Sequence, residues 1–206
     1  MKPFLVISAL ILTALTANAQ TVVVGEPIHG GTGCPKESSY LVTDNFNKFM
    51  YLFDTHQIDG SGNAAFARAS CNIRVPVSAP AGLKMVVRKA VTEGIYNVAE
   101  GDKVQVDQEV WFVGQSVRKP SKNDVRGDWN YLELGKNLSG EVIAESKCDG
   151  KDAMLALSLT SLIRKASAAP TESFVGLYKV EFRMALEPCD SVEGAGVDPV
   201  APPKAD

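Results

Sequence analysis

The chain has 206 residues, of which 45% are hydrophobic, and its 21 Lys and Arg nearly balance its 24 Asp and Glu. This apolar content is too high for a disordered chain. A formal net charge of −3 gives no general attraction to nucleic acid or to an anionic membrane. The length favours one domain with a single core.

The first 19 residues have the pattern of a secretory signal peptide. Lys2 supplies a positive start, residues 4–15 carry no charge, and Ala17-Asn18-Ala19 matches an A-x-A cleavage site. The apolar run has about 12 residues, whereas a membrane-spanning helix needs about 20. We therefore expect cleavage after Ala19 and a mature protein, starting at Gln20, that is secreted or periplasmic and bacterial in origin.

Export determines how the four cysteines are interpreted. Cys34, Cys71, Cys148 and Cys189 are even in number, and in an oxidising compartment this indicates two disulfides. Their wide spacings include no C-x-x-C, which argues against zinc binding and thioredoxin-type chemistry. Four cysteines allow three pairings, and the sequence leaves the choice open.

Apolar and polar residues alternate along most of the chain, as in strands with one buried face. The pattern is clearest over 178–187, where we expect Tyr178, Val180 and Phe182 to face the core. Further strands are expected at 38–43, 46–54, 71–78, 84–91, 103–113, 141–146 and 154–162.

Few segments depart from this pattern. The best helical candidate is the short stretch 161–169, residues 114–130 are expected to form a long exposed loop, and 191–206 are expected to be a disordered tail. Alternating strand and helix patterns are missing, which argues against a Rossmann-type fold. The sequence thus predicts an all-β protein, with a single antiparallel β-sandwich domain over 20–190.

No catalytic signature emerges. His29 and His56 are interpreted as loop or surface residues, because no G-x-S-x-G motif or comparable signature accompanies them. Acidic residues suitable for a glycosidase pair are also explained as solvated groups at strand ends or on wet faces. They are Glu93, Glu100, Asp102, Asp107 and Glu109.

Candidate binding residues lie near the end of the 114–130 segment. Trp129, an aromatic residue in a polar stretch, is suited to stacking on sugars, whereas Trp111 is expected in the core. Arg126-Gly127-Asp128 is an integrin-type tripeptide, although three-residue matches often arise by chance. We therefore take Trp129, Arg126 and Asp128 as candidate binding residues.

No cofactor is expected. The loop at 54–63 has residues that suit calcium but departs from the EF-hand template, so a plain hairpin is favoured and an irregular metal site stays an alternative.

Several local patterns resemble a known family, the secreted fungal and bacterial proteins grouped as domain of unknown function 4360. They are Gly31-Thr32-Gly33-Cys34-Pro35, Phe46-Asn47-Lys48-Phe49, Ala69-Ser70-Cys71-Asn72-Ile73-Arg74-Val75-Pro76, Pro80-Ala81-Gly82 and Trp111-Phe112-Val113-Gly114. The resemblance implies an exported, cysteine-containing, β-rich protein and supplies no catalytic residues. The chain departs from the family pattern just before its last cysteine, where Leu186-Glu187-Pro188 precedes Cys189.

These observations favour an exported non-enzymatic module that binds a protein, an envelope component or a glycan, with no nucleic-acid partner and no membrane span. One alternative is a secreted hydrolase acting on an extracellular polymer. The other is a structural envelope or coat component.

Overall fold

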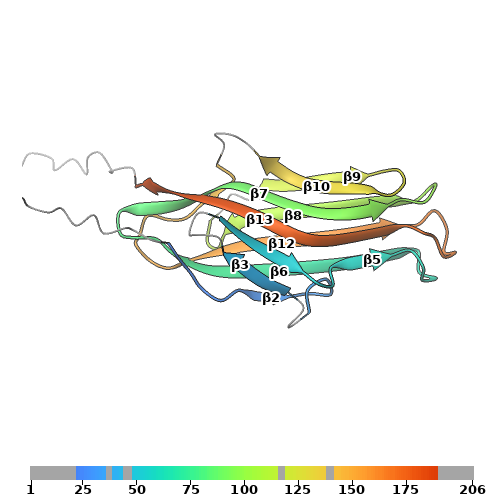
Figure 1. The fold of residues 1–206 in the computed structure, drawn as a ribbon, viewed down its shortest axis with the longest axis horizontal. Coiled ribbons are helices and arrows are strands. Elements are labelled where there is room, and N and C mark those ends of the chain that lie inside the picture. Colours follow the sequence, from blue (N-terminus) through green and yellow to red (C-terminus); the bar gives the residue numbers. More distant parts are fainter. Residues whose placement is uncertain (1–21, 36–38, 44–47, 116–118, 138–141, 190–206) are drawn as a thin grey trace, which may run out of the picture.

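The computed structural model describes residues 22–35, 39–43, 48–115, 119–137 and 142–189 (Figure 1). The expected signal peptide at 1–19 and the expected tail at 191–206 lie outside these residues. Within them every strand pairing is antiparallel and no helix occurs, so no apolar helix of membrane-spanning length is present there. The predicted antiparallel β-sandwich with two disulfides is confirmed.

Two sheets pack face to face (Figure 1). The six-stranded sheet has the order β1 (Val23–Val24), β6 (Phe66–Ser78), β12 (Ala153–Arg164), β8 (Lys103–Phe112), β9 (Lys119–Val125), and β2 (Ile28–Gly30) also pairs with β6. The seven-stranded sheet has the order β10 (Asn130–Asn137), β7 (Leu83–Asn97), β13 (Phe174–Pro188), β4 (Lys48–Phe53), β3 (Ser39–Thr43). Two short strands complete it, because β11 (Ala144–Glu145) pairs with β7 and β5 (Gln57–Asp59) pairs with β13.

The core lies between the sheets and is built from the inward-facing residues of both. Phe49 and Phe182 stack there with ring centroids 4.7 Å apart, and Leu134 and Leu159 are 0% exposed. A buried Leu-to-Ala change typically costs about 2–5 kcal/mol. Polar contacts also cross the layer at Gln108, whose Oε1 accepts from the Thr92 hydroxyl over 2.7 Å and whose Nε2 donates to the Ala90 carbonyl over 3.0 Å.

Three local predictions were wrong. Residues 161–169 form no helix, because Ser161 and Ile163 continue the alternation of β12 into the core. Part of the expected loop at 114–130 is β9, an edge strand paired with β8. Trp111 is half-buried on the outer face of the six-stranded sheet rather than in the core, and the neighbouring Val113 is 50% exposed.

The disulfides join neighbouring cysteines along the chain. Cys34 pairs with Cys71 and Cys148 with Cys189, with Cα–Cα distances of 5.3 and 5.7 Å, both normal for a disulfide. The first bond is in the core, because Cys34 and Cys71 are 0% exposed. The second joins the loop after β11 to the end of β13, where Cys148 is exposed.

This difference in burial predicts different reactivity. Mild reductant followed by alkylation of the native protein should label Cys148 and Cys189 first, because a reductant must reach the sulfur atoms. Peptide mass mapping measures the order of labelling. Labelling of Cys34 and Cys71 at an equal or earlier time would contradict it.

Candidate functional site

The chain passes from one sheet to the other through the turn at residues 126–129. This turn joins β9, at the edge of the six-stranded sheet, to β10, at the edge of the seven-stranded sheet. Gly127 adopts φ +99°, a conformation that favours glycine, and its carbonyl accepts a 3.0 Å hydrogen bond from the Val98 amide. The turn is thereby fixed against the end of β7.

The three predicted binding residues share this turn but face different hollows. Arg126 lines a pocket at the end of the sandwich, whereas Asp128 and Trp129 line a second one beside Asn97 and Glu172. All three are exposed. The three residues are therefore close together in the chain, but their side chains lie on both sides of one turn.

Trp129 belongs to a group of exposed aromatic residues. Its side chain is 63% exposed and lies against Phe174 of β13, with ring centroids 5.5 Å apart. Tyr131, two residues along the chain, is 48% exposed and pairs across the sheet with the exposed Ile95 of β7. We call Trp129, Tyr131, Phe174, Tyr178 and Ile95 the aromatic platform; it lies on the outer face of the seven-stranded sheet.

Tyr178 joins the platform because of a β-bulge. Leu177 pairs with Gly94 and Lys179 with Glu93, so Tyr178 is an extra residue without a partner on β7. The bulge leaves Leu177 and Val180 buried and turns Tyr178 outward, where it is hydrogen-bonded to Tyr131. The prediction that Tyr178 faces the core was therefore wrong.

A charged pair lies beside these rings. Lys179 Nζ is 2.8 Å from Glu93 Oε1, and the Tyr131 hydroxyl is hydrogen-bonded to the same carboxylate. Burial opposes ionisation of Glu93, but the hydrogen bonds from Lys179 and Tyr131 outweigh it and lower the pKa of the carboxyl. Glu93 is therefore an anion at neutral pH that holds the Tyr131 ring in place.

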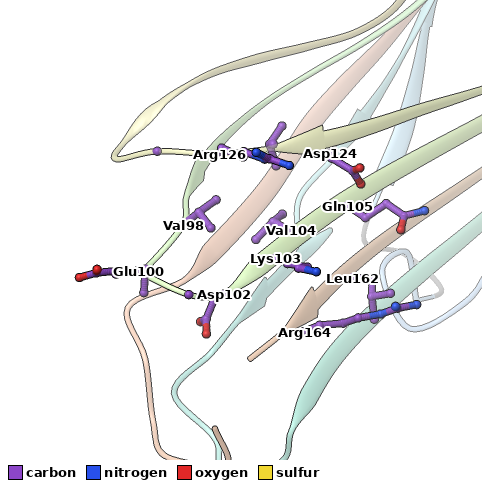
Figure 2. Close-up of a pocket in the computed structure, with 14 residues that line it drawn as sticks. Val98, Glu100, Asp102, Lys103, Val104, Gln105, Asp124, Arg126, Leu162 and Arg164 are labelled. Carbon is purple, nitrogen blue, oxygen red and sulfur yellow. The ribbon is translucent and has the colours of Figure 1, made fainter. Parts of the chain in front are cut away.

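The pocket beside Arg126 has a volume of about 690 Å³ and is lined by the β7–β8 turn and the ends of β8, β9 and β12 (Figure 2). Asp102 in that turn accepts hydrogen bonds from the Ala166 amide at 2.8 Å and from the Thr171 and Ser173 hydroxyls at 2.7 Å each. Although burial opposes ionisation, these bonds lower the pKa of Asp102. Figure 2 shows Glu100 and Asp102 pointing away from each other.

The interpretation of His56 as a loop or surface residue was wrong. The side chain is 1% exposed, and its Nε2 is 3.0 Å from the hydroxyl of Ser161, which is fully buried. Its Nδ1 has no hydrogen-bond partner among the residues that the structure describes, and burial lowers the pKa to about 4. A His–Ser pair enclosed in this way cannot contact a substrate. His29 is half-buried, with Nδ1 3.3 Å from the Cys34 carbonyl.

The described ranges contain no group of three or more His, Cys, Asp or Glu arranged to hold a metal ion. In the loop considered for calcium, Asp59 accepts hydrogen bonds from the amide and hydroxyl of Ser61.

Sequence reasoning found Trp129 but missed Tyr131, Phe174 and Tyr178. A signal for Tyr131 was present, because Trp129, Tyr131 and Glu133 alternate with the buried Leu132 and Leu134. The bulge that exposes Tyr178 has no such signal, since it interrupts an otherwise regular alternation.

The model of the family described as Domain of unknown function (DUF4360) matches residues 20–189. No curated protein matches the chain.

Among solved structures, TmCBM61 in complex with beta-1,4-galactotriose is 12% identical with a TM-score of 0.35, over 78% of this chain and 88% of that chain. The family 11 carbohydrate-binding module from Clostridium thermocellum, in complex with a beta-1,3-1,4-mixed-linked tetrasaccharide, is 10% identical with a TM-score of 0.22, over 80% and 88%. Tailspike protein 4 of bacteriophage CBA120 is 8% identical with a TM-score of 0.29, over 82% and 20%.

The burial of His56 predicts an acid-sensitive fold. Its pKa is about 4 in the folded state and about 6.5 when unfolded. The unfolded state therefore binds more protons between these values, and stability that is fully present above pH 6.5 falls by about 3 kcal/mol as the pH drops to 4. Urea unfolding at several pH values measures this loss. The lowered pKa values of Glu93 and Asp102 add a further loss of stability that begins near pH 4.5, at the acidic end of this window, and continues below it.

The matched variants are His56→Gln, which should remove most of the loss between pH 6.5 and 4, and His29→Gln, which should retain it. If His56→Gln does not fold, NMR titration of the wild-type ring gives the same answer. A His56 pKa near 6.5 would contradict the prediction.

Proposed function

The chain belongs to the DUF4360 family, whose description assigns no activity, and we propose that it is an exported module that binds a glycan on the aromatic platform. The observation that carries this proposal is the exposure of three aromatic side chains on one sheet face, beside the half-buried Phe174. Trp129, Tyr131 and Tyr178 are 63%, 48% and 39% exposed, and Phe174 lies against Trp129. A contiguous apolar patch of this kind on a soluble protein marks an interaction site.

Sugar rings suit such a surface. One face of a pyranose presents C–H groups, which pack against an aromatic ring whose face carries partial negative charge. Burial of this apolar area contributes about 25 cal/mol per Å². Rings that are already held in place lose little conformational entropy on binding, and Tyr131 is held by its hydrogen bonds to Glu93 and Tyr178.

Sugar hydroxyls also need directional partners. Next to the rings, Glu93 offers carboxylate acceptors and Lys179 offers an ammonium donor, and the two are 2.8 Å apart. A ligand hydroxyl at this pair donates to one group and accepts from the other. The platform therefore combines stacking surface with polar groups that select for orientation.

Binding fits this geometry better than hydrolysis. A glycosidase needs two carboxyl groups across a cleft, one of them free to transfer a proton. Glu93 is ion-paired with Lys179, and Asp102 accepts three hydrogen bonds from the chain itself. The lowered pKa of each keeps it an anion rather than an acid.

Export is part of the proposal. The two disulfides are of the kind that form in oxidising compartments, which agrees with the predicted signal peptide and a secreted or periplasmic location.

The proposal predicts that Trp129→Ala weakens glycan binding at least tenfold, because the largest stacking surface is lost. Tyr131→Ala should weaken binding as well. The mature protein is screened by affinity electrophoresis against soluble neutral and acidic polysaccharides, and the affinity for each polymer that binds is measured by calorimetry. Ile28→Ala is the matched control, because Ile28 is 62% exposed and lies on the other sheet.

Ile28→Ala should bind like the wild type. Equal affinity of Trp129→Ala and wild type for every polymer that binds would overturn the platform, as would a wild type that binds none.

A further inference from the structure

We propose a second binding site, for the carboxylate or sulfate groups of an acidic polysaccharide, on the outer face of the six-stranded sheet and the adjoining end of the sandwich. The site consists of Arg68, Lys103, Arg126 and Arg164, which we call the cation cluster. Its ligand class rests on the proposed glycan-binding function, whereas the cluster rests on observations independent of the aromatic platform.

The register of the sheet brings these side chains together. Arg164 of β12 lies directly opposite Lys103 of β8, and Leu162 lies opposite Arg68 of β6. Residues directly opposite each other on paired strands share one face, and so do residues 162 and 164, which are two apart along β12. The side chains of Arg68, Lys103 and Arg164 therefore lie on the same face of the sheet. Neighbouring strands are about 4.8 Å apart. Arg164 and Lys103 therefore lie in one row of cross-strand neighbours, and Arg68 lies in the adjacent row.

Hollows adjoin these cations. Lys103, Arg126 and Arg164 line the pocket of about 690 Å³ (Figure 2), and Arg68 and Arg164 line another of about 550 Å³. The two pockets share Gln105, Leu162 and Arg164, so the cations border one continuous depression. A guanidinium in such a depression is suited to a planar carboxylate or to a sulfate, which it binds through two parallel N–H donors.

The cations of the cluster are available to a ligand. In the part of the chain that the structure describes, the side chains of Arg68, Lys103, Arg126 and Arg164 make no hydrogen bond or ion pair. On the opposite face, by contrast, cations are neutralised within the fold. Lys48, Lys89 and Arg183 surround Glu181, and Lys179 is paired with Glu93.

The acids near the cluster are largely engaged. Both Asp107 oxygens accept from Gln105 Nε2, at 2.9 and 2.8 Å, and Asp107 lies opposite Lys122 of β9. Asp102 is held by its three hydrogen bonds, whereas Asp124 and Glu100 are exposed acids that line the pocket of about 690 Å³ together with the cations. We therefore expect anion binding of moderate strength that weakens with salt.

The depression continues toward the platform. The pocket of about 690 Å³ shares Val98, Ala99 and Glu100 with the smaller one that contains Asp128 and Trp129. A hollowed surface thus runs from Trp129 around the end of the sandwich to Arg164. A polysaccharide that stacks on Trp129 has a path to the cation cluster, and a polymer with an acidic group on its sugars satisfies both surfaces.

The test compares two arginine variants. Arg68→Gln/Arg164→Gln removes two cations of the cluster, and Arg74→Gln is the control for charge. Arg74 is exposed on the same strand and face as Arg68, six residues and about 20 Å away along the strand. The probes are polygalacturonate, its methyl-esterified form and dextran sulfate, measured by calorimetry at low and high salt.

The wild type should bind polygalacturonate or dextran sulfate at least tenfold more tightly than the methyl ester at low salt, and high salt should reduce the difference. The double variant should lose this preference, and Arg74→Gln should keep it. A preference for polygalacturonate assigns the anion as a carboxylate, and a preference for dextran sulfate assigns it as a sulfate.

The proposal is overturned if the double variant keeps the preference, if Arg74→Gln loses it equally, or if the wild type shows none. Failure of the platform is recognised separately, because Trp129→Ala would then leave the affinity for every probe unchanged while the double variant still lowers the affinity for anionic ones.

Discussion

The apolar layer between the two sheets is the interaction on which the rest of this structure depends. Each long strand contributes every second residue to that layer, so the fold is stabilised by inward-facing side chains such as Phe182 and Leu159. The residues between them point outward and do not pack in the core. Exposed aromatics such as Trp129 therefore lie outside the core, and the proposed glycan binding accounts for their position on one face.

The surfaces proposed to bind meet at one end of the sandwich, which is fixed by polar contacts. Asp102 joins the β7–β8 turn to the segment between β12 and β13 through Ala166, Thr171 and Ser173. Lys165 of that segment donates to the Gly60 and Ala169 carbonyls at 3.1 and 2.9 Å. Turns held in this way keep their shape without a ligand, which lowers the entropic cost of binding one.

The sequence predicted what depends on local alternation and composition. The sandwich, most of the strands and the two disulfides followed from residue periodicity and from an even number of cysteines in a chain expected to be exported. Strand neighbours depend on contacts between residues that are distant in the chain. The sequence therefore could not predict the pairing of Cys34 with Cys71 or which side chains gather on the two outer sheet faces. His56 was misjudged for the same reason, because the segments that bury it are distant in the chain.

The candidate site was predicted only in part. Trp129 stood out because it is an aromatic residue in a polar stretch, and the structure shows that it is exposed. Tyr178 was assigned to the core because a regular strand would place it there, and only the bulge opposite Gly94 and Glu93 reverses its direction. The cation cluster requires the register of β6, β12 and β8, which no periodicity reveals.

The most direct test of the central claim is an NMR titration of the two tryptophan indole N–H signals with a polysaccharide that the protein binds. Trp129 lies on the platform, and Trp111 lies on the opposite sheet and serves as the internal reference. Binding on the platform predicts that the Trp129 signal shifts with saturation while the Trp111 signal stays in place. Saturation of the protein with an unchanged Trp129 signal would contradict the account.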